Sequence, residues 1–407
     1  MKLVLVQPSS FFSWEALNLG YIAAYVRRSG FDDIDFFTAS FDSEHDILEG
    51  CKNADVVGFT CTSPQIKHAL YLARNIKKEK PSILTVFGGV HPSALPDATA
   101  AFPEVDIVVV GEGEEAMLKI LNGDRNPIIH GLPIKNIDTL PFPDRHLLKL
   151  ERHLTKTQQV EGRRITSIFT SRGCPFKCPF CASHAVWGRE QRRRSPESIV
   201  EEFEILKKEW NVSYISFADD EVGLNKRHFS ELSELLIKRG NKISWGCNVV
   251  VSTLNKDLLK LMWTAGCRDL WMGVESGSPK ILEDMKKPFD INDIRKAFGI
   301  ARELGFSRRA YILLGMPNET LEDITLTDKL IEEIDPDVVG FTILAPFPGT
   351  EFYDAVKHKD VDWSQIDEYT NSLTSTKYLS NTDLHVIQKR MVEKYYAKRA
   401  YHHKLYE

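Results

Sequence analysis

Three cysteines within eight residues constrain this chain more than any other feature of its sequence. Cys174, Cys178 and Cys181 are separated by three and then by two residues. Gly173 before them and the prolines among them predict a loop rather than a helix. Four thiolates would close an iron–sulfur cluster, whereas three leave one iron open to another ligand. A zinc site with His184 as the fourth ligand is the alternative.

The cysteine spacing, with Phe180 directly before the third cysteine, resembles the signature of the radical S-adenosylmethionine (SAM) enzymes. The resemblance implies that the three cysteines hold a 4Fe-4S iron–sulfur cluster and that Phe180 lies at the cofactor. In that family the open iron chelates the amino and carboxylate groups of SAM, and an electron from the cluster cleaves SAM to a 5′-deoxyadenosyl radical. A reductant such as flavodoxin or ferredoxin is therefore an implied partner.

The composition is that of an ordinary soluble globular protein. The chain has 407 residues, of which 43% are hydrophobic and 27% charged. No apolar run predicts a transmembrane helix, and the apolar part of the N-terminus is too short for a signal peptide. A net charge of −5 gives no reason to expect nucleic acid as a partner. Seven cysteines, an odd number, suit a reducing compartment, so we expect a cytoplasmic protein.

Short apolar runs alternate with amphipathic stretches over residues 1–125. Strands are expected at residues 2–6, 34–38, 55–61, 82–87 and 106–110. Helices are expected between them, at residues 15–29 and 64–79 among others. This alternation predicts a Rossmann-like, doubly wound parallel sheet, which binds its ligands at the carboxyl ends of the strands.

Three of these strand ends carry hydroxyl groups or glycines. The residues are Gln7 to Ser10 after the first strand, Thr60, Thr62 and Ser63 after the third, and Gly88 and Gly89 after the fourth. Glycines let a large flat ligand approach the backbone closely. The arrangement resembles the cobalamin-binding domain that precedes many radical SAM domains, where such turns enclose the nucleotide tail of cobalamin. The turn Gly111–Glu115 also recurs in that family.

The loop after the first strand contains no histidine, although some cobalamin proteins supply a lower axial ligand from it. That loop spans residues 9–20, so we expect cobalamin to bind without a protein histidine below the cobalt. His91 is better explained as a structural histidine in a turn than as an axial ligand. The alternative is a degenerate Rossmann-like domain that binds nothing and only shapes the active site.

A proline-containing linker at residues 126–160 leads into a second alternating region, residues 161–351. Strands are expected there at residues 165–170, 213–218, 242–247, 269–274, 309–314 and 337–343, each followed by a helix. Ser195 and Pro196 form the expected N-cap and first turn of the first helix. Six such units predict a partial (β/α)6 TIM barrel, which is the radical SAM core, with functional residues at the carboxyl ends of its strands.

Polar residues follow three of the barrel strands. The resemblance places the ammonium group of SAM beside Asp219 and Asp220, after the second strand; an acidic helix cap is the alternative. Glu275 and Ser276 follow the fourth strand in the phrase Gly-Val-Glu-Ser-Gly-Ser, which suits the ribose diol or the methionyl end of SAM. Gly315 follows the fifth strand, in a segment whose backbone reads the adenine in the family.

Residues 352–407 predict a short helical region without a catalytic candidate. The leading hypothesis is a cobalamin-dependent radical SAM methyltransferase that methylates an unactivated carbon of a small-molecule substrate, through a 5′-deoxyadenosyl radical and methylcobalamin. The second hypothesis is a radical cyclase, ring-forming or carbon–carbon coupling enzyme without net methyl transfer. The third is a regulatory or electron-transfer protein that uses the cluster as a sensor, against which the SAM-type motifs argue.

Overall fold

The computed structural model describes residues 1–9, 15–357 and 359–396, and the chain divides into two compact units. Unit 1 comprises Met1–Leu150, Cys181–Arg192 and Phe347–Asp367. Unit 2 comprises Glu151–Phe180, Arg193–Pro346 and Glu368–Glu407. In the part of the chain that the structure describes, no helix is long and apolar enough to cross a membrane.

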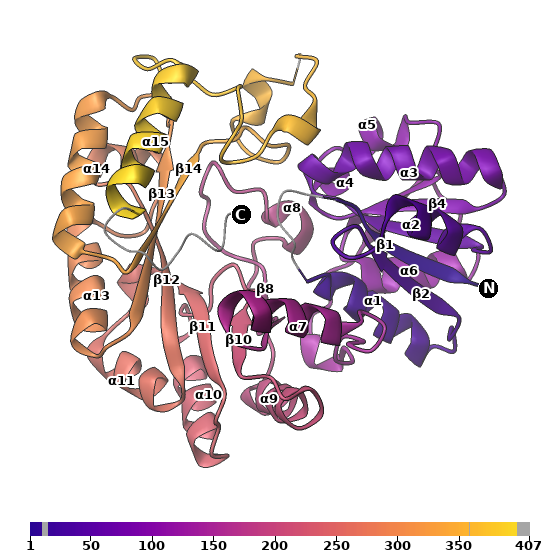
Figure 1. The fold of residues 1–407 in the computed structure, drawn as a ribbon, viewed down its shortest axis with the longest axis horizontal. Helices are drawn as coiled ribbons and strands as arrows, with labels where there is room; N and C mark the ends of the chain where they lie inside the picture. The colour runs from indigo at the N-terminus through magenta and orange to yellow at the C-terminus, as the bar shows by residue number, and fades with distance from the viewer. Residues whose placement is uncertain (10–14, 358, 397–407) are drawn as a thin grey trace. The chain divides into compact units, whose positions relative to one another are not determined.

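Unit 1 is built on a six-stranded parallel sheet with helices on both faces (Figure 1). Its strands are β1 (Leu3–Gln7), β2 (Ile34–Thr38), β3 (Val56–Thr60), β4 (Leu84–Gly88), β5 (Ile107–Gly111) and β6 (Ile128–Gly131). Its helices are α1 (Leu17–Arg28), α2 (Glu44–Cys51), α3 (Ile66–Glu79), α4 (Val90–Ala94), α5 (Pro96–Ala100), α6 (Gly113–Leu121) and α8 (His184–Trp187). The strand order β2-β1-β3-β4-β5-β6 places the topological switch point between β1 and β3, where sheets of this kind bind ligands.

The alternating side chains of β1 explain why both faces of this sheet are covered. Leu3 and Leu5 join the core formed with α1 and α6, whereas Val4 and Val6 join the core formed with α2 and α3. All four side chains are buried. A strand that is buried on both faces reads as a continuous apolar run, which is the pattern that predicted this strand.

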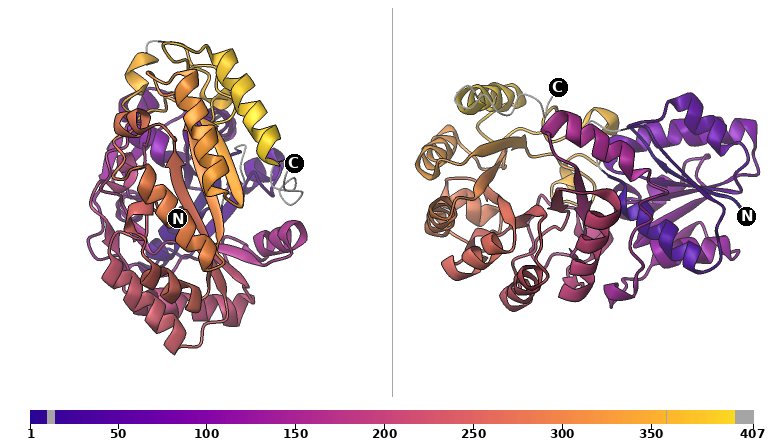
Figure 2. Two further views of the ribbon diagram at one scale, coloured as in Figure 1. Left: turned by 90° about the vertical axis from the view of Figure 1, so that its left-hand side faces the viewer. Right: turned by 60° about the horizontal axis from the view of Figure 1, so that its bottom comes forward.

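Unit 2 contains a second six-stranded parallel sheet, with the order β14-β13-β12-β11-β10-β7. Its strands are β7 (Ile165–Ile168), β10 (Tyr214–Phe217), β11 (Ser244–Val249), β12 (Cys267–Glu275), β13 (Ser307–Leu314) and β14 (Val338–Ile343). Two short strands, β8 (Ser171–Arg172) and β9 (Arg192–Arg193), lie on either side of the cysteine loop in the sequence. Its helices are α7 (Leu150–Glu161), α9 (Pro196–Trp210), α10 (Lys226–Lys238), α11 (Lys256–Thr264), α12 (Pro279–Asp284), α13 (Ile291–Glu303), α14 (Leu321–Ile334) and α15 (Asn381–Tyr396). Figure 2 shows the helices α9 to α14 along the outer side of this curled sheet. The expected partial barrel of six βα units is therefore present.

The C-terminal region covers the free edge of β14. Three alternate carbonyl oxygens of this strand accept hydrogen bonds from C-terminal side chains: Val339 from the Tyr396 hydroxyl (3.1 Å), Phe341 from Gln388 Nε2 (3.0 Å) and Ile343 from Asn371 Nδ2 (3.4 Å). An open sheet edge invites pairing with other chains. The C-terminal region thus supplies the partners that the last strand of an incomplete barrel would otherwise lack.

The expected linker at residues 126–160 contains regular structure that the sequence did not predict. Strand β6 pairs with β5 as the sixth strand of the first sheet, and α7 fills the end of this range. Strand β6 has only four residues and lies between Pro127 and Pro133, so no apolar run marks it. Ser10 of the expected hydroxyl turn and residues 397–407 of the expected helical region lie outside the described residues.

Candidate functional site

The cysteine loop begins at the carboxyl end of the first barrel strand. Gly173 has a φ of +88°, which favours glycine, and the chain then continues without regular structure through the three cysteines. Cys174, Cys178 and Cys181 are partly buried, whereas the other four cysteines are buried in the cores. Within the described residues, no three His, Cys, Asp or Glu side chains are grouped as a metal site. The donor set itself, three cysteines on one short loop, fits an iron–sulfur cluster by its chemistry.

Asp219 holds the segment that leads into the cysteine loop. Its carboxylate, 2% exposed, accepts hydrogen bonds from Thr170 N (3.0 Å), Thr170 Oγ1 (2.9 Å) and Ser171 Oγ (2.6 Å), and also from the Ser171 amide. Burial raises the pKa of Asp219 to about 6, although these donors oppose the shift. These hydrogen bonds tie Asp219 to the start of the cysteine loop, and its predicted contact with SAM stays a prediction.

The two residues after Asp219 lie in different surroundings. Asp220 is exposed, whereas Glu221 is 3% exposed and accepts a hydrogen bond from Gly223 N at 2.8 Å. Burial raises the pKa of Glu221 to about 7, and the positive charge of Lys287 opposes that shift. Neither Glu221 nor Lys287 was identified from the sequence as a site residue.

Lys287 connects two of the predicted site residues. Its ammonium nitrogen lies 2.7 Å from Glu275 Oε1 and 5.1 Å from the centroid of the Phe180 ring. The Glu275 and Lys287 side chains are 12% and 11% exposed, so their charges interact more strongly than those of a surface pair. Glu275 has a φ of +63°, in the left-handed region, just after a register shift in β12. Such strain in a residue other than glycine is typical of functional sites.

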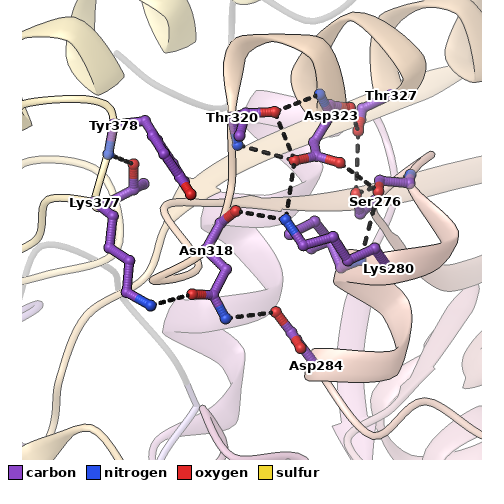
Figure 3. A network of polar contacts seen from close by, with 12 residues as sticks. Ser276, Lys280, Asp284, Asn318, Thr320, Asp323, Thr327, Lys377 and Tyr378 are labelled. Carbon is purple, nitrogen blue, oxygen red and sulfur yellow. Dashed lines mark hydrogen bonds and ion pairs between the residues drawn. The ribbon is translucent and has the colours of Figure 1, made fainter.

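The serines after Glu275 hold the turn against α14. Ser276 is fully buried, and its hydroxyl lies 3.2 Å from Thr327 Oγ1 (Figure 3). The Ser278 hydroxyl donates to Asp323 Oδ1 at 2.6 Å. A Cβ at Gly277 would lie 2.4 Å from the carbonyl oxygen of Leu326, so only glycine allows α14 to approach this closely. The structure therefore gives Ser276 a packing role, and Glu275 is the member of the phrase that faces a charged group.

Gly315 lies in a tightly packed turn after β13. Its φ is +94°, and its amide donates to Glu319 Oε2 at 2.6 Å. Burial raises the pKa of Glu319 to about 7. A Cβ on Gly315 would lie 3.0 Å from Thr374 Cγ2 and 3.2 Å from Leu384 Cδ1. The C-terminal region, rather than open space, thus occupies the position of the missing side chain.

The polar residues at the strand ends of unit 1 are engaged with one another. Asn18 Nδ2 donates to Thr60 Oγ1 at 2.7 Å, and Gln65 Oε1 accepts from the amide and the hydroxyl of Thr62 at 3.0 and 3.1 Å. Gly88 leaves room for a Cβ, but one at Gly89 would lie 2.7 Å from the Cys61 carbonyl oxygen. Glycine is thus required at position 89 because the backbone of Cys61 lies so close, and this requirement does not depend on a ligand.

His91 is a buried histidine in the short helix α4, which follows β4 where the sequence predicted a turn. It is 5% exposed, its Nδ1 lies 3.0 Å from Ser63 Oγ, and its ring lies edge-on to Trp363. Burial lowers the pKa of His91 to about 4. These contacts support the structural interpretation of His91 over the axial-ligand one.

Comparison with known proteins matches both halves of the chain to families. Residues 6–121 match the B12 binding domain and residues 168–331 match the radical SAM superfamily. An uncharacterised methyltransferase of Pyrococcus horikoshii is 31% identical over 83% of this chain and 77% of its own length. An anaerobic magnesium-protoporphyrin IX monomethyl ester cyclase of Rubrivivax gelatinosus is 28% identical over 85% and 67%.

The fold also resembles that of a solved radical SAM methyltransferase. The structure of TsrM from Kitasatospora setae, with cobalamin and an iron–sulfur cluster bound, superposes with a TM-score of 0.75. It covers 99% of this chain and 92% of its own, at 18% identity, and therefore supports the fold alone. The matches confirm the expected fold class, enzyme class and cofactor set, and they argue against the zinc and sensor alternatives. This chain belongs to the radical SAM superfamily, in the group whose members also carry a B12 binding domain.

Proposed function

We propose that this radical SAM enzyme is a cobalamin-dependent methyltransferase that acts on an unactivated carbon of a small-molecule substrate. We infer the SAM site from the ion pair between Glu275 and Lys287 at the carboxyl end of β12. The methionyl end of SAM bears one ammonium and one carboxylate group. Glu275 has the charge opposite to the ammonium group, and Lys287 has the charge opposite to the carboxylate. Bound SAM would therefore replace the single ion pair between Glu275 and Lys287 with two ion pairs to the ligand.

Different residues of the chain would bind the cofactors and position the cysteine loop. Cys174, Cys178 and Cys181 would bind the iron–sulfur cluster, and Phe180 would place an apolar ring beside Lys287. When bound, the cluster and SAM supply the radical, and cobalamin supplies a methyl carrier. Asp219 would hold the start of the cysteine loop in place through Thr170 and Ser171.

The remaining assignments follow from the same proposal. Residues 1–125 would bind cobalamin, residues 161–351 would bind and cleave SAM, and residues 126–160 and 352–407 would serve as linker and helical C-terminal region. A cytoplasmic one-electron donor, flavodoxin or ferredoxin, would reduce the cluster. Because the cyclase relative is 28% identical over most of the chain, ring formation without net methyl transfer is the second candidate function.

Isotope labelling distinguishes the two candidate functions. The cluster- and cobalamin-loaded protein is incubated with a reductant, with a small-molecule extract and with SAM that carries a trideuterated methyl group. Methyl transfer predicts a product heavier by the labelled methyl group, together with 5′-deoxyadenosine. Formation of 5′-deoxyadenosine and a changed product without the label would contradict methyl transfer and favour the cyclase. The variant Lys287→Met should lower both products, because the carboxylate of SAM would lose its cationic partner.

A further inference from the structure

The C-terminal region contacts the turn Gly315–Asn318 at three points. The methyl group of Thr374 packs at Gly315, where a Cβ would lie 3.0 Å away. The amide of Lys377 donates to the Pro317 carbonyl at 2.9 Å, and Lys377 Nζ donates to Asn318 Oδ1 at 2.7 Å. Residues 374–377 thus contact Gly315, Pro317 and Asn318 in a turn that lies about 60 residues earlier in the chain.

The opposite side of the same turn is held by α12. Asn318 Nδ2 donates to Asp284 Oδ2 at 3.1 Å, and Lys280 Nζ donates to the Asn318 carbonyl at 3.0 Å. Figure 3 shows Asn318 between Lys377 on one side and Lys280 and Asp284 on the other. Helix α12 directly follows the phrase that contains Glu275. The turn after β13 and the turn after β12 are therefore linked to the C-terminal region by one polar network.

The segment is itself anchored, so it can determine where the turn lies. Thr374 is 6% exposed, and its hydroxyl donates to the Leu344 carbonyl at the end of β14. Asn381 Nδ2, at the start of α15, donates to the Thr374 carbonyl at 2.8 Å. Asn371 is fully buried against the edge of β14. These anchors lie on the barrel edge and on the C-terminal helix rather than on the turn.

We propose that residues 371–377 form a strap that positions the turn Gly315–Asn318 for SAM, with Thr374 and Lys377 as its positioning residues. The inference rests on the proposed function, which places SAM at Glu275 on the neighbouring strand β12, and on the family resemblance, which implies that the segment of Gly315 contacts the adenine of SAM. A small displacement of a turn that reads its ligand with main-chain groups weakens every contact at once. The C-terminal region would thus control the affinity for SAM although it contributes no group to the chemistry.

The test compares single substitutions in the full chain after cluster loading. Thr374→Ser removes the methyl group from Gly315 and keeps the hydroxyl that binds Leu344. Lys377→Met removes the hydrogen bond to Asn318, and Lys377→Arg is the conservative variant that can restore it. Tyr378→Ala is the matched control, because Tyr378 is 64% exposed and bonds in the network only through its main-chain amide.

The dissociation constant for SAM is measured by equilibrium dialysis, together with the iron content and the melting temperature of each variant. Thr374→Ser and Lys377→Met should raise the dissociation constant, and the KM for SAM in 5′-deoxyadenosine formation, by about three- to tenfold with kcat little changed. Lys377→Arg and Tyr378→Ala should remain near the wild type. Wild-type affinity in both Thr374→Ser and Lys377→Met would overturn the strap. A wild-type protein that carries its cluster and binds no SAM would instead overturn the proposed function.

Discussion

Asp219 lies after β10 and holds the segment that leads into the cysteine loop. Its carboxylate accepts hydrogen bonds from the amides and hydroxyls of Thr170 and Ser171, just before the cysteine loop. Glu275, by contrast, lies 2.7 Å from the ammonium group of Lys287 and faces a group of opposite charge. Residues that the sequence groups together at strand ends therefore have two kinds of role, in positioning a loop and in presenting charge.

Replacing Asp219 by Ala should reduce cluster incorporation. Two buried amides would lose their acceptor, which costs about 1–3 kcal/mol for each unsatisfied group, and the start of the loop would be displaced. Iron content after reconstitution should fall to about half of the wild-type value or less, while cobalamin binding stays unchanged. The exposed neighbour Asp220 supplies the control, since Asp220→Ala should load iron normally. Full iron loading of Asp219→Ala would contradict the positioning role.

His91 should make the stability of the chain sensitive to acid. Its pKa in the folded protein is lowered to about 4, whereas an unfolded histidine titrates near 6.5. As the pH falls below about 6.5 the unfolded state takes up a proton first, so stability is lost between pH 6.5 and 4, by up to about 3 kcal/mol. Urea denaturation of the wild type and of His91→Gln at several pH values measures this difference. Equal pH slopes for the two proteins would contradict the assignment.

At the scale of elements, a buried ion pair fixes the segment that follows the third cysteine. Arg192 Nη2 lies 2.5 Å from Glu112 Oε1, and the two side chains are 5% and 1% exposed. The same guanidinium donates to the carbonyls of Ile134 (2.8 Å) and Trp187 (3.1 Å). Glu112 belongs to the Gly-Glu-Gly turn between β5 and α6, so this turn holds the residues after Cys181 within unit 1.

Replacing only one member of this ion pair should lower the stability of the protein more than replacing both members. Arg192→Met removes the guanidinium that faces the buried Glu112 carboxylate, and we expect a loss of about 3–5 kcal/mol in the free energy of unfolding. The double variant Arg192→Met with Glu112→Leu also removes the buried carboxylate and should recover a large part of that loss. Urea denaturation followed by circular dichroism measures all three proteins. A double variant less stable than Arg192→Met would argue against the pair as the cause.

The elements and sites that could be predicted from the sequence are those whose residues form a pattern within one short stretch of the chain. Sites formed by residues far apart in the chain could not be predicted. Strand β1 was predictable because burial on both faces gives a continuous apolar run, and the cysteine loop because its ligands are neighbours in the chain. Lys287 carries no such pattern, since it lies 12 positions after Glu275, beyond helix α12. The strap was equally hidden, because the contact between Lys377 and Asn318 joins residues 59 positions apart.

At the scale of the whole molecule, the chain combines two ligand-binding folds, each with its polar residues at the carboxyl ends of parallel strands. Unit 1 has its switch point between β1 and β3, near Thr60 and Asn18. In unit 2, Cys174 and Cys178 follow β7, and the pair of Glu275 and Lys287 lies after β12. We therefore expect one chain to carry both cofactors that radical methyl transfer requires.

The most direct test of that claim is the cofactor content of the protein itself. The chain is purified without oxygen, reconstituted with iron, sulfide and hydroxocobalamin, and desalted; iron is then quantified chemically and cobalamin by its visible absorption. We expect about four irons and about one cobalamin per chain. About four irons without cobalamin would show instead that residues 1–125 do not bind the methyl carrier.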